Sequence, residues 1–194
     1  CAMGQAVGTA AAIAVKKGTG PAEIVSHITE LQQTLLRDDA YLPWVRQTFS
    51  DVTRNARLES SQGNPEPVRD GINRPVGDEP HSWTHSQGDW IAYLFDRNTM
   101  ISTVTLVLDS ALDRLVALSL HQEDDQLRST PGVMPKSFRI EGLVDGKWRE
   151  LASIQENHQR LCHSPVESDL DGIRFVLDKT WGAEESKMYA FYVD

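Results

Sequence analysis

The chain has 194 residues, of which 40% are hydrophobic, and it carries a formal net charge of −9. This length corresponds to one domain, or to one domain with an appendage. The acidic balance argues against nucleic acid as a partner, because binding phosphates needs a cationic surface. No apolar run is long enough to span a bilayer. The two cysteines, Cys1 and Cys162, fix neither a disulfide nor a cellular compartment.

The first segment predicts one helix, from about Gly4 to Lys17. It is rich in alanine, the best helix former. Two lysines fall in its last turn, where cations suit the helix dipole, and Gly18 is suited to end it. Small residues recur at four-residue spacing and form one face, on which another backbone or a flat ligand could pack closely; they are Gly4, Gly8 and Ala12.

A second helix is expected to start at Pro21, since proline favours the first turn. The pattern allows it to end early and restart near Thr29. A stripe of isoleucine and leucine at helical spacing continues to Leu36. Pro43 disfavours helix just before itself, so the helix should end ahead of it.

The two predicted helical segments together resemble part of a known protein family. MGQAVGTAAAIAVKKG, followed by LQQTLLRDDAYLP, resembles the C-terminal end of the FAD-dependent oxidoreductase domain in bacterial proteins related to glucose-inhibited-division and succinate-dehydrogenase-type flavoproteins. The resemblance implies that the start of this helix faces FAD, where free N–H groups and the positive dipole end stabilise a reduced flavin. It implies five cofactor-facing or supporting residues, namely Met3, Gly4, Gln5, Gly8 and Thr9.

The chain lacks a GxGxxG motif after a strand, the fingerprint that would hold the ADP half of FAD. The resemblance therefore implies the C-terminal portion of a longer oxidoreductase, with the flavin-binding domain as a missing partner. Such a portion would bind no FAD by itself and would not be catalytic alone. An ordinary alanine-rich packing helix is the alternative. Substrate, electron acceptor and compartment, cytoplasmic or periplasmic, stay open.

From Asp51 the pattern changes to short alternating runs with regular turn signals, which is typical of an antiparallel β-sandwich. The run at residues 101–108 is apolar on both faces and predicts a central strand. Asp145 and Gly146 predict a hairpin turn. Strands are expected at residues 56–60, 90–95, 101–108, 115–120, 137–144, 148–154, 159–165, 172–177 and 188–193.

The order of these features resembles the galactose-binding-like jelly roll of the discoidin or coagulation-factor type C class. The matching motifs are Glu59-Ser60-Ser61, Val68-x-Asp70-Gly71, Trp83, Trp90-Ile91, Ile101-x-x-Val104, Lys136-x-Phe138-x-Ile140 and Asp145-Gly146-x-Trp148. The expected fold is therefore mainly β: an antiparallel jelly-roll sandwich at residues 51–194, preceded at residues 1–50 by flavoprotein helices and a connector. Domains of this class often bind sugars, and many carry calcium.

Three residues of the HSWTH motif are candidates for glycan binding. Trp83 could stack on a sugar ring, flanked by His81 and His85. The alternative places Trp83 at the edge of the core, filling the end of the sandwich. On a strand the two histidines would lie ~13 Å apart, too far to share a metal ion.

Asp70 and Asn73 could hold calcium through their side-chain oxygens. The alternative is an ordinary Asp-Gly turn. Cys162 and His163 should face opposite sides of a strand, which argues against a catalytic dyad. No catalytic residues are predicted in this chain.

Three hypotheses follow from these patterns. The first is the C-terminal portion of an FAD-dependent oxidoreductase with an accessory sandwich. The second is a carbohydrate-binding module whose loops around residues 70–85 grip a glycan. The third is a structural sandwich that docks onto a flavin domain or pairs subunits, with the N-terminal helix as a route to a homo-oligomer.

Overall fold

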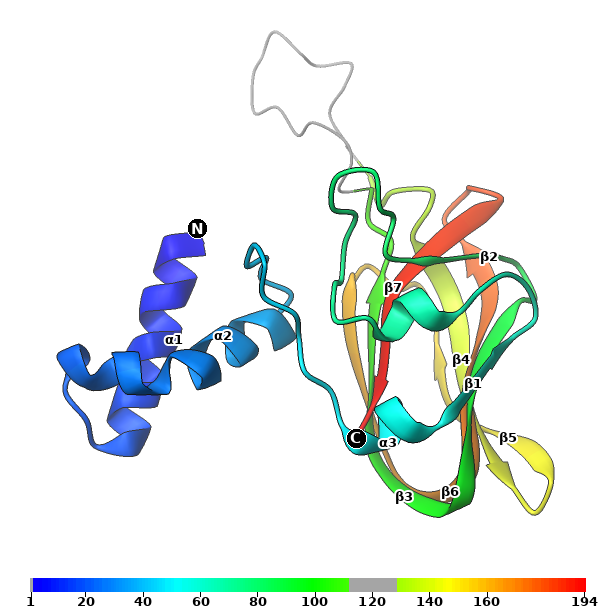
Figure 1. Ribbon diagram of the computed structural model, residues 1–194. Helices are drawn as coiled ribbons and strands as arrows, with labels where there is room; N and C mark the ends of the chain where they lie inside the picture. Colours follow the sequence, from blue (N-terminus) through cyan, green and yellow to red (C-terminus); the bar gives the residue numbers. More distant parts are fainter. Residues whose placement is uncertain (1, 112–128) are drawn as a thin grey trace, which may run out of the picture. The chain divides into compact units, whose positions relative to one another are not determined.

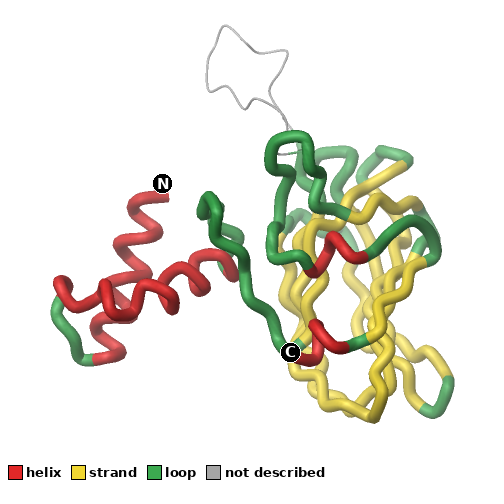
Figure 2. The backbone as a smooth tube through the Cα atoms, viewed as in Figure 1, coloured by secondary structure: helices red, strands yellow, loops and turns green. Residues whose placement is uncertain are grey.

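A computed structural model describes residues 2–111 and 129–194 and divides the chain into two compact units, with the boundary between Thr48 and Phe49. The first unit is helical and the second is built of β-strands (Figures 1 and 2). The expectation of a mainly β chain with a helical N-terminal segment is confirmed. None of the described helices has the length and apolar character needed to cross a membrane.

The helical unit contains α1 (Ala2–Lys17), the 3₁₀ helix η1 (Pro21–His27) and α2 (Ile28–Arg37). Gly18 ends α1 with φ of 65°, and η1 begins at the predicted proline. The interrupted second helix is confirmed as a 3₁₀ segment that runs into an α-helix. Its buried apolar side chains are few: Ile13, Ala14, Leu35 and Leu36.

The predicted connector leads into a short helix. Residues 45–50 are not helical, and a short helix, α3 (Asp51–Asn55), follows them. Ser50 caps α3 by accepting a hydrogen bond from Thr53 N at 3.1 Å, which is the favoured way to start a helix. Phe49 stacks on Tyr192 with ring centroids 5.3 Å apart. Phe49 and Ser50, predicted as connector, therefore already contact the sandwich.

The β unit is one antiparallel system of seven strands. The hydrogen-bonded order is β2-β7-β3-β6-β4-β5, with β1 pairing with β3. The strands are β1 (Arg57–Ser60), β2 (Trp83–Ser86), β3 (Trp90–Leu108), β4 (Pro135–Val144), β5 (Lys147–Ile154), β6 (Leu161–Thr180) and β7 (Glu185–Val193). A second 3₁₀ helix, η2 (Glu66–Arg69), lies between β1 and β2.

Two long strands bend around one end of the sandwich (Figure 1). The sequence predicts a turn between residues 95 and 101, but β3 continues through it, with a register shift against β6 between Leu94 and Thr99. Its first half pairs with β1 and its second half with β7. The predicted strands 159–165 and 172–177 likewise form one strand, β6. Such a register shift interrupts the pairing locally and lets the strand bend, and the pairing resumes beyond it.

The core lies between the two layers that these bent strands create. It includes Trp83, Tyr93, Phe138, Phe175 and Phe191, each at most 1% exposed. The central position of the 101–108 run is confirmed, because β3 pairs with β6 and β7 on its two sides. The sequence missed β2, and the strand predicted at residues 115–120 lies outside the described residues.

Candidate functional site

The sandwich has an open pocket of about 680 Å³. The segments that form it lie at the end of the sandwich opposite the bend of β3 and β6 (Figure 1). It is formed by residues of β2 and β7, by the residues after β3, and by the segments before β4 and β7. Its lining residues are Thr84, Asp109, Ala111, Pro131, Gly132, Val133, Gly182, Ala183, Glu184, Glu185, Ser186 and Lys187.

Backbone hydrogen bonds hold the pocket walls together. Ala183 N donates to Gly132 O at 3.0 Å, and Asp109 N donates to Lys187 O at 2.9 Å. These bonds lie outside the strand ladders and join three separate segments at one place, so they tie the pocket walls together. Sites on such supported backbone are better positioned than sites on unsupported loops.

Carboxylates dominate the charged groups of the pocket. Asp109 is buried and accepts a hydrogen bond from Ala111 N at 3.0 Å. Glu184 and Glu185 are exposed, and neither carboxylate has an ion pair or hydrogen bond to another residue that the structure describes. Lys187 is the one basic side chain among the lining residues. The pocket therefore carries more negative than positive charge.

Ser186, one of the lining residues, carries a buried polar side chain. It is 1% exposed, and its hydroxyl has no hydrogen-bond partner among the described residues. A buried hydroxyl without a partner is costly, and most native structures satisfy such groups with protein, water or ligand. Ser186 pairs with His85 in the β2–β7 ladder, so its hydroxyl faces the core rather than the pocket.

Trp181 adjoins the pocket through Gly182. Its Nε1 donates to Asn157 O at 2.7 Å, and Lys136 Nζ lies 4.5 Å from its ring centroid. The centroid of the His158 ring lies 4.7 Å from the centroid of the Trp181 ring. Trp181 is only partly buried, so it is an aromatic side chain at this end of the sandwich that keeps some contact with solvent.

The structure places Trp83 and His85 in the core. Trp83 is 1% exposed, and its Nε1 donates to Gln62 O at 2.8 Å. The His85 ring is stacked on the Trp83 ring at 4.6 Å, and it meets the edge of Phe175 at 5.6 Å. No sugar could stack on Trp83 without displacing these neighbours, so the arrangement favours the core interpretation of this residue.

Burial also decides the charge of His85. Its side chain is fully buried, and desolvation lowers its pKa from 6.5 to about 4 against the smaller raising effects of Trp83 O and Asp89. Its Nδ1 lies 3.3 Å from Trp83 O, and its Nε2 has no hydrogen-bond partner in the part of the chain that the structure describes. His85 is therefore a neutral core residue near pH 7 rather than a solvent-facing ligand.

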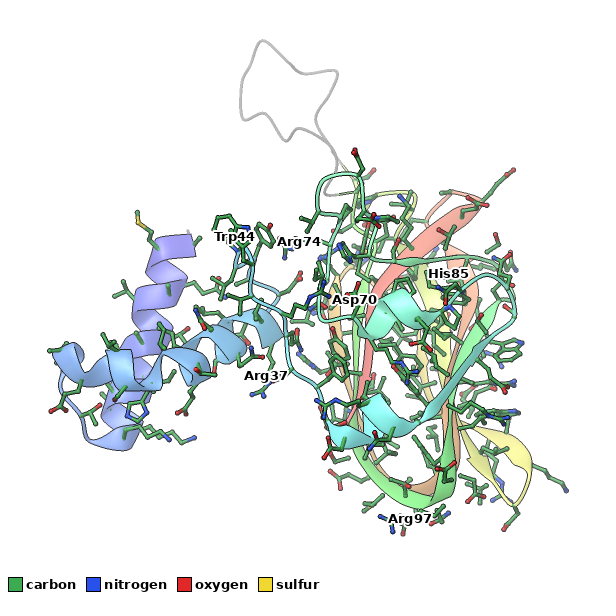
Figure 3. The ribbon with its side chains drawn as sticks, in the orientation of Figure 1. Arg37, Trp44, Asp70, Arg74, His85 and Arg97 are labelled. Carbon is green, nitrogen blue, oxygen red and sulfur yellow. The ribbon has the colours of Figure 1, made fainter. Side chains whose placement is uncertain are left out.

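His81 lies with the predicted calcium ligands rather than with Trp83. His81 Nδ1 is 2.6 Å from Asp70 Oδ2, and Asp70 Oδ1 accepts a hydrogen bond from Ile72 N at 2.8 Å. Asn73 Oδ1 accepts a hydrogen bond from the Tyr192 hydroxyl at 2.8 Å. Figure 3 shows Asp70 beside η2 and His85 on β2. Among residues 2–111 and 129–194, no three His, Cys, Asp or Glu side chains gather as a metal site.

These bonds bear on the calcium hypothesis. Both carboxylate oxygens of Asp70 and the amide oxygen of Asn73 already have partners, so an ion would have to replace them. The geometry is that of an Asx turn after η2, which ties the loop to β7 through Tyr192. We find no cradle for calcium in this arrangement.

The predicted flavin-facing residues lie on α1. Met3, Gly4 and Gln5 are exposed, and a Cβ atom added at Gly4 or Gly8 would meet nothing within 4 Å. The small-residue face is thus uncovered within the helical unit. A flavin ring needs a second wall, and the described residues of this unit do not supply one opposite α1.

Gly8→Ala tests whether that face is covered in solution. Alanine in a helix interior is more stable than glycine by ~1 kcal/mol, and no atom here opposes the new methyl group. We expect amide hydrogen exchange in α1 to slow by about fivefold. Gly18→Ala is the control and should destabilise, because Gly18 has φ of 65°. Faster exchange in Gly8→Ala would mean that another surface packs on this face.

Cys162 and His163 do not form a dyad. Cys162 is buried, and burial raises the pKa of its thiol to about 11, which leaves little thiolate at neutral pH. His163 is exposed on the opposite face of β6, with Nδ1 3.0 Å from the Thr105 hydroxyl.

Comparisons with known proteins define the fold. No protein-family model matches the chain, and no curated protein matches it either. The family 32 carbohydrate-binding module of Streptococcus pneumoniae EndoD is similar in structure, with a TM-score of 0.53 at 12% identity over 75% of this chain and 99% of that one. Chitosan-binding module 2 of a Paenibacillus sp. IK-5 chitosanase/glucanase, solved with chitotriose, gives 0.52 at 14% identity over 74% and 98%.

A third similar structure is the family 32 module of Clostridium perfringens NanJ in complex with galactose. Its TM-score is 0.50 at 10% identity, over 73% of this chain and 95% of that one. At such identities the likeness establishes the fold alone. The chain has the β-sandwich fold of family 32 carbohydrate-binding modules, and the predicted galactose-binding-like fold is confirmed. The comparisons give no support to the oxidoreductase hypothesis.

Proposed function

We propose that residues 49–194 act as a carbohydrate-binding module, and that the pocket between β2, β7 and the segment before β4 is its glycan site. The observation that carries this proposal is the open pocket, lined by both charged and apolar residues, at one end of a fold shared with sugar-binding modules. It corresponds to the second of the sequence-based hypotheses. The site, however, differs from the one predicted around Trp83.

The pocket chemistry suits a polyhydroxylated ligand. Glu184 and Glu185 offer acceptors to sugar hydroxyls, and Lys187 offers a donor. Trp181 beside the pocket provides an aromatic face against which the C–H side of a sugar could lie. Pockets with a few convergent polar groups are the usual form of small-ligand sites.

The test is a binding titration with a panel of mono- and oligosaccharides, using the full chain and a blocked variant. Thr84→Met combined with Ala183→Met places two larger side chains at the pocket without touching the backbone bonds that form it. We expect binding to weaken at least about tenfold. Ser153→Met on exposed β5 is the matched control and should bind like the wild type. Equal binding by the blocked variant would place the site elsewhere.

We further propose that the helical unit packs on another protein surface. Seven of the eight large hydrophobic side chains exposed in the described residues belong to residues 2–48, and such exposure is typical of interaction sites. A flavin-binding domain is the partner that the sequence resemblance implies, and a second copy of the chain is the alternative. Light scattering of the full chain distinguishes them, since a monomer at micromolar concentration would exclude the second copy.

A further inference from the structure

We propose that the core of the sandwich binds ordered water between the His85 ring and the hydroxyls of Ser186 and Ser110. The inference goes beyond the proposed function and does not depend on it, because it concerns the inside of the sandwich rather than the pocket. It rests on three buried polar atoms that have no partner among the described residues and that strand pairing brings to one place.

The first observation is the set of unpartnered atoms. Four buried side-chain polar atoms lack a hydrogen-bond partner in the described part of the chain. Three of them belong to the sandwich, namely His85 Nε2, Ser186 Oγ and Ser110 Oγ, and the fourth belongs to Thr19 of the helical unit. A buried polar group without a partner costs free energy, and native proteins usually satisfy such groups with protein or with water. The three atoms of the sandwich therefore need a partner.

Strand pairing places these three residues in one row. His85 on β2 is the register partner of Ser186 on β7, and both residues are at most 1% exposed. On the other side of β7, Asp109 N donates to Lys187 O at 2.9 Å, so the chain beyond β3 still runs beside β7. Ser110 is the next residue after this bond, and its hydroxyl is buried. The row therefore crosses three neighbouring segments at one end of the core.

The His85 ring needs a donor at Nε2. Its Nδ1 lies 3.3 Å from Trp83 O, which can only accept, so the single ring proton of neutral His85 belongs on Nδ1 and Nε2 is an acceptor. The aromatic neighbours of the ring are Trp83 and Phe175. The indole N–H of Trp83 already donates to Gln62 O, and phenylalanine has no donor. Neither neighbour can supply the hydrogen that Nε2 lacks.

Water fits the needs of all three atoms. The Ser186 hydroxyl makes no hydrogen bond to His85, although the two residues are paired across the strands. A buried water molecule typically makes about three hydrogen bonds to polar groups that the protein leaves unsatisfied. One molecule in this row would donate to His85 Nε2 and to one serine hydroxyl, and would accept from the other hydroxyl. This arrangement leaves no atom of the row without a partner.

Removing the Ser186 hydroxyl gives opposite results with and without the water. An unpartnered hydroxyl is a cost, so in a dry core Ser186→Ala would stabilise the sandwich. With the water, Ser186→Ala loses a hydrogen bond, and we expect the unfolding equilibrium constant in urea to rise by about fivefold. Ser110→Ala should raise it in the same way. Ser86→Ala is the matched control: it removes a partly exposed hydroxyl from β2 and should change the constant by less than about twofold.

A high-resolution crystal structure of the full chain then distinguishes water from a direct bond. We expect electron density for a water molecule within about 3.2 Å of His85 Nε2 and of at least one of the two serine hydroxyls. A dry site would overturn the proposal, whether or not Ser186 Oγ bonds to Nε2 directly. A stabilised Ser186→Ala variant would overturn it as well. Neither result bears on glycan binding, which the saccharide titration tests separately.

Discussion

Trp83→Ala is expected to destabilise the sandwich by about 3–5 kcal/mol, the range for deleting a large buried aromatic side chain. The indole is 1% exposed and is stacked on His85 at 4.6 Å. Its removal leaves a cavity next to β2, an edge strand of four residues. It also leaves Gln62 O without the Trp83 Nε1 donor. Most of the lost stability should come from the cavity. As a short edge strand, β2 has few other contacts, so it depends strongly on the packing of Trp83.

Urea denaturation followed by far-UV circular dichroism measures this effect, and Trp148→Ala is the matched control. Trp148 is only half-buried on β5, with Arg174 4.4 Å from its ring centroid, so its loss should cost less than half as much. If Trp83→Ala stayed as stable as the wild type while losing glycan binding, Trp83 would be a solvent-facing platform and the core placement would be wrong.

The fold was largely predictable because it depends on local patterns. Alternating apolar residues locate most strands, and the small residues and lysines locate α1 and its end. The bend of β3 was not predictable from pattern alone. Three of the four residues between Leu94 and Thr99 are polar and look like a turn, but β3 runs through them and pairs with β6 on both sides of the register shift. Pairing of this kind depends on distant parts of the chain.

The candidate site was harder to predict, and β2 shows why. The sequence draws attention to Trp83 and His85 because aromatic and imidazole groups bind ligands in many proteins. Successive residues of a strand point to opposite faces, so burying these two turns Thr84 outward, where it lines the pocket. The sequence did contain one signal: the Gly182–Glu185 turn brings two adjacent carboxylates to the end of a strand. These residues come together with Asp109 and residues 131–133 only in the folded chain, so the sequence pattern could not predict that they line one pocket.

The second large effect is a pH dependence of stability that arises from His85. Desolvation holds its folded-state pKa at about 4, below the ordinary 6.5 of the unfolded chain. Between these values the unfolded chain binds a proton that the folded chain does not, so the free energy of unfolding falls as the pH is lowered from 6.5 to 4. At ~1.4 kcal/mol for each unit of pKa shift, the loss from this group reaches ~3 kcal/mol at pH 4.

Wild-type chain and His85→Phe, denatured in urea at several pH values from 7 to 4, isolate this contribution. Phenylalanine keeps a flat ring against Trp83 and removes both the titration and the unpartnered Nε2. Acidic residues contribute to both curves alike, so the difference between the curves reports His85. We expect the variant to gain stability relative to the wild type steadily below pH 6.5. A constant difference over this range would mean that His85 is accessible to protons in the folded state, and that β2 does not bury it.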